Sequence, residues 1–291
     1  MTKSFDPNSE SFNRLLKHAI SPRPICFAST IDNDGNVNLS PFSFFNLMGQ
    51  TPPICVFSPV NKMRDGSKKH TLDNVLEHPE CVINIVNYDI VQQQSLASVE
   101  FKKGVNEFEK AGLTPIPSEI VKPPRVKESP IQMECKVRNV VSISDEPGAA
   151  NLVIAEILRI HVEENFLDEQ NHVSPYTLDL VARLGDDYYC RIIPESIFEV
   201  ARPATKAFGI GIDSLPNDVK LSKFLTGNHL GQLGTQEKIP TKEMVDNFIV
   251  QLKERVEIEK FKPIEIRHQI AAKLLDQGDV NGAWFWLLME L

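Results

Sequence analysis

The chain has 291 residues, and its 31 lysines and arginines against 39 aspartates and glutamates give a formal net charge of −8. Nucleic-acid-binding proteins usually carry a basic face and a pI well above neutrality, whereas this sequence has a pI near 5.5. Hydrophobic residues make up 42% of the chain and charged residues 24%, the proportions of a folded globular protein. We therefore expect no nucleic-acid partner and no extensive disorder.

The first 13 residues contain Lys3, Asp6 and Glu10 and no apolar run, which argues against a secretory signal. No later segment has the roughly 18 to 20 apolar residues of a membrane span. The five cysteines lie far apart, without metal-ligand spacing: Cys26, Cys55, Cys81, Cys135 and Cys190. We expect a cytoplasmic protein with reduced, buried thiols, no membrane partner and no metal.

Short apolar segments rich in β-branched residues predict strands in the first part of the chain. Six segments bounded by Pro, Gly, Asn or Asp share this pattern: 24–31, 37–40, 53–58, 81–86, 131–143 and 152–162. Asp34-Gly35 between the first two predicts a hairpin. Apolar residues at 133, 135 and 137 alternate with Glu134, Lys136 and Arg138, which predicts a half-buried strand.

Helices are predicted at 71–78 and 90–97, followed by a Pro-rich surface loop at 114–130. Because no long helices separate the strands, an antiparallel barrel or sandwich is favoured over a parallel sheet. After Arg191 the pattern becomes helical, at 241–259, 264–275 and 283–290. The first of these helices places five apolar residues on one side: Met244, Phe248, Ile249, Leu252 and Val256. We predict a β-rich domain at 1–200 and a helical C-terminal extension at 201–291.

Residues 61–74 form a basic window within the acidic chain. Four cations (Lys62, Arg64, Lys68 and Lys69) against two anions (Asp65 and Asp73) give it a net charge of +2. Thr71 adds a hydroxyl at the start of a predicted helix, where backbone N–H groups favour an anion. A phosphate monoester suits such a site. The alternative is a solvated Lys-rich loop.

Aromatic residues alternate with small polar ones in Asn38-Leu39-Ser40-Pro41-Phe42-Ser43-Phe44-Phe45-Asn46. A flat heteroaromatic ring needs apolar cover on its faces and hydrogen bonds at its edge, and this segment offers both. The alternative is the end of a strand that packs its phenylalanines into the core.

These residues resemble the flavin reductase-like family. The resemblance rests on Arg23-Pro24, the 38–46 segment, Pro52-Pro53, the segment Lys69-His70-Thr71-Leu72-Asp73-Asn74-Val75, and Arg183-Leu184-Gly185, and it covers roughly residues 15–192. It implies a mainly β fold with some helix, an antiparallel FMN-binding split β-barrel, to which this chain adds its helical extension. It also implies a homodimer.

The resemblance further implies the cofactor FMN, with NADH or NADPH as co-substrate and hydride transfer to flavin N5. The phosphate site carries over to Lys69 and Thr71, although His70 stands where the family has Asp. The flavin contacts carry over to Asn38, Ser40, Phe42, Ser43, Phe44 and Asn46. Ser58 is implied near the phosphate or the ring edge. Phe44 stands where relatives often have Trp, which keeps a stacking surface but removes an N–H donor.

Two positions are weaker candidates for nicotinamide or substrate contact. Many relatives carry Gly-Asp-His before the last long strand, but this chain reads Gly148-Ala149-Ala150-Asn151, which leaves His161 as a possible replacement. Arg183 is the other candidate, and each has an ordinary structural interpretation. Two other functions stay open: a flavoredoxin-like electron carrier for a redox protein partner, and a split-barrel interaction module without flavin.

Overall fold

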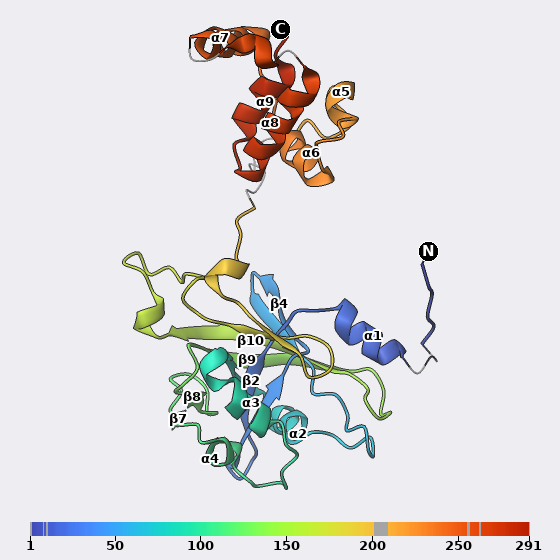
Figure 1. Cartoon of the computed structure of the whole chain (residues 1–291). Helices are drawn as coiled ribbons and strands as arrows, with labels where there is room; N and C mark the ends of the chain where they lie inside the picture. The colour runs from blue at the N-terminus through green and yellow to red at the C-terminus, as the bar shows by residue number, and fades with distance from the viewer. Residues whose placement is uncertain are drawn as a thin grey trace. The chain divides into compact units, whose positions relative to one another are not determined.

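The computed structural model describes residues 2–7, 9, 11–200, 209–254, 257–261 and 263–290. It divides into two compact units, Met1–Phe198 and Glu199–Leu291 (Figure 1). The domain boundary predicted between residues 200 and 201 adjoins residues 201–208, which lie outside the described part of the chain. Each unit has its own hydrophobic core.

The first unit is built on a seven-stranded antiparallel sheet with the strand order β3-β2-β6-β9-β10-β5-β4. Its strands are β2 (Cys26–Ile31), β3 (Val37–Phe42), β4 (Phe45–Gln50), β5 (Pro53–Phe57), β6 (Glu80–Ile85), β9 (Ile131–Ser142) and β10 (Asn151–Val162). Six of the seven confirm predicted strands. β4 was not predicted: only its first two residues, Phe45 and Asn46, belong to the 38–46 segment, which was interpreted as a flavin contact or as the end of a strand.

The hairpin between β2 and β3 is as predicted. Gly35 has a φ of +82°, in the left-handed region that glycine tolerates best. The side chain of Asp32 accepts hydrogen bonds from the backbone N–H groups of Asp34 (3.0 Å) and Asn36 (2.8 Å). This turn sets the register in which Ile31 pairs with Val37 and Ala28 with Ser40.

The core of the first unit contains four of the five cysteines. Cys26, Cys55, Cys81 and Cys135 are buried, Cys190 is partly exposed, and all five are free. Cys81 and Cys135 lie directly opposite one another on β6 and β9. The prediction that the thiols are buried is confirmed for these four residues.

Glu134 departs from the prediction that β9 is half buried. Met133, Cys135 and Val137 are buried as expected, but Glu134 is also fully buried. Its carboxylate accepts hydrogen bonds from the backbone N–H groups of Glu119, Ile120 and Val121 at 2.6 to 3.0 Å. The segment that covers this face therefore supplies the donors that a buried carboxylate requires.

Smaller elements surround the sheet. Three strands, β1 (Arg23–Pro24), β11 (Val181–Arg183) and β12 (Tyr189–Arg191), form a second sheet. The short helices are α1 (Phe12–Ala19), α2 (His70–Glu77), η1 (Tyr88–Ile90), α3 (Val91–Ala97), α4 (Glu107–Ala111), η2 (Glu164–Phe166) and η3 (Pro194–Ser196). α2 and α3 confirm the two predicted helices.

The segment predicted as a Pro-rich surface loop is more ordered than expected. It contains a two-stranded pairing of β7 (Pro115–Ile116) with β8 (Arg125–Val126). Val121 and Val126 are buried, and the side chain of Asn84 accepts a hydrogen bond from the backbone N–H of Val126. Prolines obscured these contacts in the sequence because they interrupt any strand pattern.

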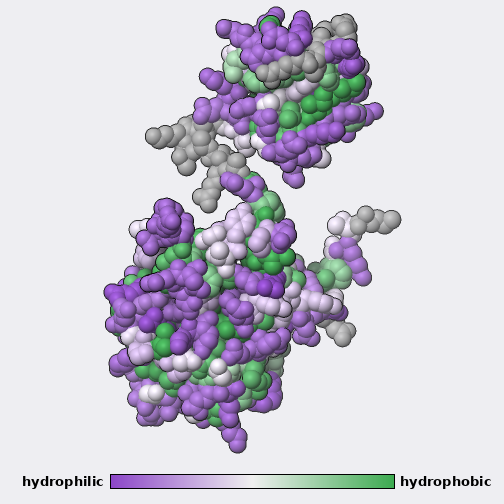
Figure 2. All heavy atoms as spheres, turned by 60° about the vertical axis from the view of Figure 1, so that its left-hand side comes forward, coloured by the Kyte–Doolittle hydropathy of each residue, from purple (hydrophilic) through white to green (hydrophobic). Residues whose placement is uncertain are grey.

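The second unit is helical, as predicted. Its helices are α5 (Asn217–Lys220), α6 (Gly227–Gly234), α7 (Lys242–Lys253), η4 (Ile258–Phe261), α8 (Ile264–Asp276) and α9 (Val280–Leu288). Trp284, Leu275 and Met289 are at the centre of its core. Figure 2 shows a band of hydrophobic residues between hydrophilic ones on the visible face of this unit.

Helix α7 differs from its prediction in extent and in its buried face. It ends at Lys253, although a helix to residue 259 was predicted. Val245 and Ile249 are buried, whereas Met244 is 49% exposed, so the buried face is rotated from the predicted one. Val256, predicted on that face, lies outside the described residues.

In the part of the chain that the structure describes, no helix of either unit is long and apolar enough to cross a membrane.

Candidate functional site

The basic window folds as a fixed loop that leads into α2. The backbone N–H of Lys62 donates to the carbonyl of Ser67 (2.9 Å), and that of Gly66 donates to the carbonyl of Lys62 (2.9 Å). Gly66 has a φ of +70°, and a Cβ there would lie 3.1 Å from the carbonyl oxygen of Asp145. The position therefore needs glycine both for its conformation and for the close approach.

Asp65 stabilises the same loop. Its Oδ1 accepts hydrogen bonds from the backbone N–H (2.9 Å) and the hydroxyl (2.6 Å) of Ser67. These bonds, together with Arg64, lower the pKa of Asp65 to about 2. Asp65 is therefore ionised at neutral pH and accepts both bonds as a carboxylate.

Two of the four cations in this window are already paired. Lys62 lies 2.5 Å from Glu100, and Arg64 lies 3.2 Å from Asp65. No ion pair in the described part of the chain includes Lys68 or Lys69. Lys68 is exposed, but Lys69 is partly buried, and burial is the largest cause of its lowered pKa. Lys69 is therefore a partly buried cation that forms no ion pair among the described residues, although the Glu100 carboxylate is close enough to raise its pKa in opposition to burial.

The first turn of α2 has free donors beside Lys69. Lys69 is the N-cap residue, in extended conformation, and no side chain caps the helix. Within the described residues, the backbone N–H groups of His70 and Thr71 have no hydrogen-bond acceptor. Free N–H groups at a helix N-terminus attract anions.

Asn38 connects this turn to the sheet. Its Nδ2 donates to the hydroxyl oxygen of Thr71 at 3.0 Å, and both side chains are buried. Because Thr71 accepts this bond, its own hydroxyl hydrogen is left to be donated to another group. Lys69 Nζ lies 5.7 Å from the ring centroid of Phe42. The structure thus brings together four predicted site residues: Asn38, Phe42, Lys69 and Thr71.

The aromatic segment divides its phenylalanines between the core and the surface. Phe42 is buried and lies 5.2 Å from Phe57, centroid to centroid, so the alternative of core packing is confirmed for this residue. Phe44 is 47% exposed and presents its ring. Ser40 and Ser43 are partly exposed, while Asn46 is exposed and its Oδ1 accepts from the N–H of Leu47.

Ser58 joins this segment to the basic loop. Its N–H donates to the carbonyl of Phe44 (2.9 Å), and its hydroxyl accepts from the N–H of Asn151 (3.2 Å). Asn151 also donates to the side-chain oxygen of Asn61 (2.9 Å), at the start of the loop. Sequence reasoning missed both asparagines, since their role depends on the pairing of distant segments.

Within one chain, the structure places His161 far from Ser58 and the basic loop. Asn151, which is hydrogen-bonded to Ser58, is the first residue of β10, and His161 follows ten residues later, roughly 33 Å along an extended strand. His161 Nε2 lies 2.7 Å from Glu134 Oε1. The ordinary structural interpretation of His161 therefore accounts for its contacts.

Arg183 is connected to the aromatic segment by Arg23, which lies between Arg183 and Phe44. Arg23 belongs to the family pattern but was not predicted as a site residue. The two arginines pair directly across β1 and β11. The Arg23 guanidinium lies 5.8 Å from the ring centroid of Phe44 and donates to the carbonyls of Lys17, Ile20 and Leu184. Burial, and then Arg183, lower the pKa of Arg23.

The comparisons with known proteins agree with this geometry. An uncharacterized protein of Aquifex aeolicus (strain VF5) is 37% identical over 195 residues, which cover 67% of this chain and 97% of that protein. The structure of nitrilotriacetate monooxygenase component B from Bacillus cereus is 30% identical, with a TM-score of 0.63, and covers 69% of this chain and 99% of its own. The structure of a 2-nitrobenzoate 2-nitroreductase from Pseudomonas fluorescens is 26% identical, with a TM-score of 0.62, and covers 70% and 98%.

Each of these proteins is matched over nearly its whole length by about two thirds of this chain, so the remaining third has no counterpart in them. The expected antiparallel split-barrel fold is confirmed. The family model described as "Flavin reductase like domain" matches residues 18–178. The chain therefore belongs to the flavin reductase-like family.

Proposed function

We propose that this protein is an FMN-dependent oxidoreductase that takes electrons from NADH or NADPH and passes them to flavin or a similar acceptor. One observation carries the proposal: the partly buried cation Lys69, the free N–H groups of α2 and the oriented hydroxyl of Thr71 meet beside Asn38. Family membership supports flavin as the group that this arrangement serves.

The donor set fits the phosphate of FMN. A phosphate monoester carries up to two negative charges and accepts several hydrogen bonds. Lys69 supplies the positive charge, and the N–H groups of His70 and Thr71 with the Thr71 hydroxyl supply short donors. Asn38 holds that hydroxyl in place. Lys62 and Arg64 are paired with carboxylates, and the unpaired Lys68 is exposed to solvent, so the partly buried Lys69 is the cation of this window that gains most from a bound anion.

The ring system fits the surface around Phe44. The exposed Phe44 ring would cover one face of a flat heterocycle. Ser43 and Asn46, close to it in sequence, keep polar side chains at least partly exposed, and the buried Ser58 donates its N–H to the Phe44 carbonyl. Arg23 Nε is buried and has no hydrogen-bond partner in the part of the chain that the structure describes. A carbonyl at the edge of a bound ring would satisfy such a donor.

Bound FMN would supply the redox chemistry, by accepting a hydride equivalent from the nicotinamide at N5. The chain's own residues bind and orient. Lys69 and Thr71 fix the phosphate end, Phe44 excludes water from one face, and Arg183 adds positive charge at the edge of the site. Hydride transfer itself needs no side-chain acid or base, so positioning is the main contribution of the protein.

The test is an absorption spectrum of the full chain, alone and after addition of FMN, followed by anaerobic addition of NADH or NADPH. We expect bound flavin to give a visible spectrum that one of the nucleotides bleaches within seconds. Bleaching only by a reduced protein partner would instead favour an electron carrier. A chain that stays colourless after incubation with FMN would favour an interaction module.

We further propose that the protein is a homodimer in which a second copy covers β4. β4 is an edge strand of the sheet, and its residues Leu47 and Met48 are 55% and 63% exposed, next to Phe44. An exposed apolar edge strand invites pairing with another chain. A partner copy here would cover the proposed flavin surface.

Replacing Leu47 by glutamate is expected to weaken this dimer at least about tenfold, because the interface would bury an unpaired charge. Light scattering coupled to size-exclusion chromatography over a dilution series measures the change. Leu76→Glu is the matched control, since Leu76 is also about half exposed but lies on α2. Wild-type protein that is monomeric when loaded with FMN would refute the dimer.

A further inference from the structure

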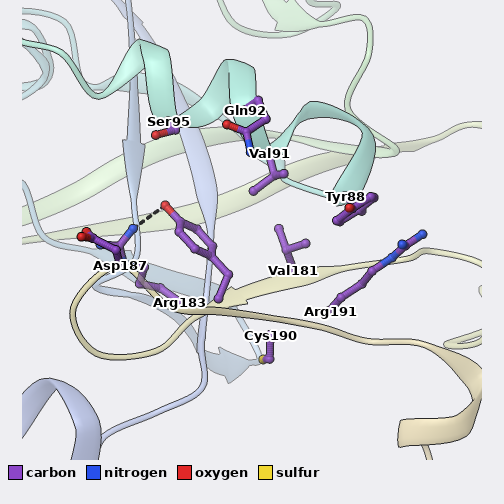
Figure 3. Close-up of a pocket in the computed structure, with 10 residues that line it drawn as sticks. Tyr88, Val91, Gln92, Ser95, Val181, Arg183, Asp187, Cys190 and Arg191 are labelled. Carbon is purple, nitrogen blue, oxygen red and sulfur yellow. Dashed lines mark hydrogen bonds and ion pairs between the residues drawn. The ribbon is translucent and has the colours of Figure 1, made fainter.

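A pocket lies between α3 and the β11–β12 hairpin of the first unit. Its cavity has a volume of about 430 Å³, within the range of small-molecule sites. Figure 3 shows the side chains of Ser95, Gln92, Val91 and Tyr88 on one side, and Val181, Arg183 and Arg191 on the other. Among these residues, Arg183 alone is a site residue predicted from the sequence.

Each end of the pocket has an arginine stacked on a tyrosine. The guanidinium of Arg191 lies 3.7 Å from the ring centroid of Tyr88, and that of Arg183 lies 4.5 Å from the centroid of Tyr189. Stacking of this kind holds flat groups in defined planes. Planar side chains therefore line both ends of the pocket, a shape suited to a planar ligand.

The two arginines differ in how many hydrogen-bond donors they have left for a ligand. Asp179 accepts two hydrogen bonds of 2.6 Å from Arg191, which neutralises that end. Among the described residues, Arg183 donates only to the Tyr189 hydroxyl and the Asp186 carbonyl, and its ion-pair partner Asp187, at 3.6 Å, is fully exposed. A guanidinium has five N–H donors, so Arg183 retains donors for an anionic ligand group.

The middle of the pocket is apolar. Val91 from α3 and Val181 from β11 point toward one another between the two ends (Figure 3). The Ser95 hydroxyl and the Gln92 amide, both on exposed residues of α3, add hydrogen-bonding groups at the rim. An apolar centre, aromatic walls and one available cation suit an aromatic ring that carries an anionic group.

The pocket borders the proposed flavin surface. Arg183 pairs across β1 and β11 with Arg23, whose guanidinium lies against Phe44. Residues directly opposite on paired strands have their side chains on the same face. A ligand held at Arg183 would therefore reach toward Phe44.

We propose that this pocket is a second substrate subsite, which binds a planar aromatic ring bearing a phosphate or carboxylate. The inference rests on the proposed function, because it assigns the pocket to a reactant of the flavin. Two sources share this chemistry: the adenylate half of NADH or NADPH, and an aromatic acid that accepts electrons. AMP and benzoate are the probes that separate them.

The test is isothermal titration of AMP and of benzoate into the full chain, with and without FMN. Ser95→Trp is expected to fill the pocket and weaken binding of the recognised probe more than about tenfold. Leu96→Trp is the matched control, because Leu96 neighbours Ser95 on α3 and is exposed but does not line the pocket. Gln92→Trp replaces Ser95→Trp if that variant does not fold.

FMN affinity is measured on every variant and should not change. Loss of AMP binding in Ser95→Trp alone assigns the adenylate source, and loss of benzoate binding alone assigns the aromatic acid. Failure of both probes to bind the wild-type chain, or unchanged binding in both pocket variants, would overturn the inference. Absence of FMN binding with intact probe binding would refute the proposed function and leave a ligand site.

Discussion

Replacing Lys69 by alanine is expected to weaken FMN binding by about 1.5 to 3 kcal/mol, or roughly 10- to 150-fold in Kd. The reason is that Lys69 is partly buried beside the N-terminus of α2 and forms no ion pair among the described residues. Its bond to the phosphate would be charge-assisted and partly shielded from water. Fluorescence titration of FMN into the full chain measures the loss.

Lys68→Ala is the matched control, since it removes the same charge one residue earlier from an exposed position. Solvent screens such a charge, and we expect a change below about 0.5 kcal/mol. Riboflavin, which lacks the phosphate, should bind the wild type and Lys69→Ala equally well. Equal FMN affinity of wild type and Lys69→Ala would remove Lys69 from the phosphate site.

The sheet could be predicted from the sequence because its signals are local. Alternating or continuous apolar residues mark each central strand, and Asp34-Gly35 marks a turn whose geometry depends only on its own backbone and on Asp32. β4 lacked such a signal. Its exposed residues do not alternate by polarity, and its pairing with β5 is defined by tertiary contacts.

The candidate site was predictable only in part, for the same reason. The family pattern predicts Lys69, Thr71 and Asn38, and the structure shows that two of them are hydrogen-bonded to each other. The bond from Asn151 to Asn61 and the position of Arg23 against Phe44 join residues that are 90 and 21 positions apart in the chain. No local pattern encodes such contacts. The same limit explains why the burial of Glu134 was not predicted.

Replacing Glu134 by alanine is expected to lower the free energy of unfolding of the first unit by about 3 to 5 kcal/mol. The substitution leaves the N–H groups of Glu119, Ile120 and Val121 without their acceptor and removes the partner of His161. Denaturant unfolding followed by far-UV circular dichroism measures the loss. Both tryptophans, Trp284 and Trp286, are in the second unit, so their fluorescence reports on that unit separately and should not change.

The contribution of Glu134 should also depend on pH in a defined direction. Burial raises the pKa of this carboxyl, but the three backbone N–H groups and His161 outweigh burial and hold the pKa at about 2, below its ordinary 4.5. A depressed folded-state pKa stabilises the fold fully above the unfolded-state value, and this stabilisation is lost as the pH falls from about 4.5 toward 2. The difference in unfolding free energy between wild type and Glu134→Gln should therefore shrink over that range.

Glu119→Gln is the control, because Glu119 is an exposed carboxylate paired with Arg159, and it should change the free energy of unfolding by less than about 1 kcal/mol. If the difference in unfolding free energy between wild type and Glu134→Gln stays constant from pH 7 to pH 2, the negative charge of Glu134 does not stabilise the fold.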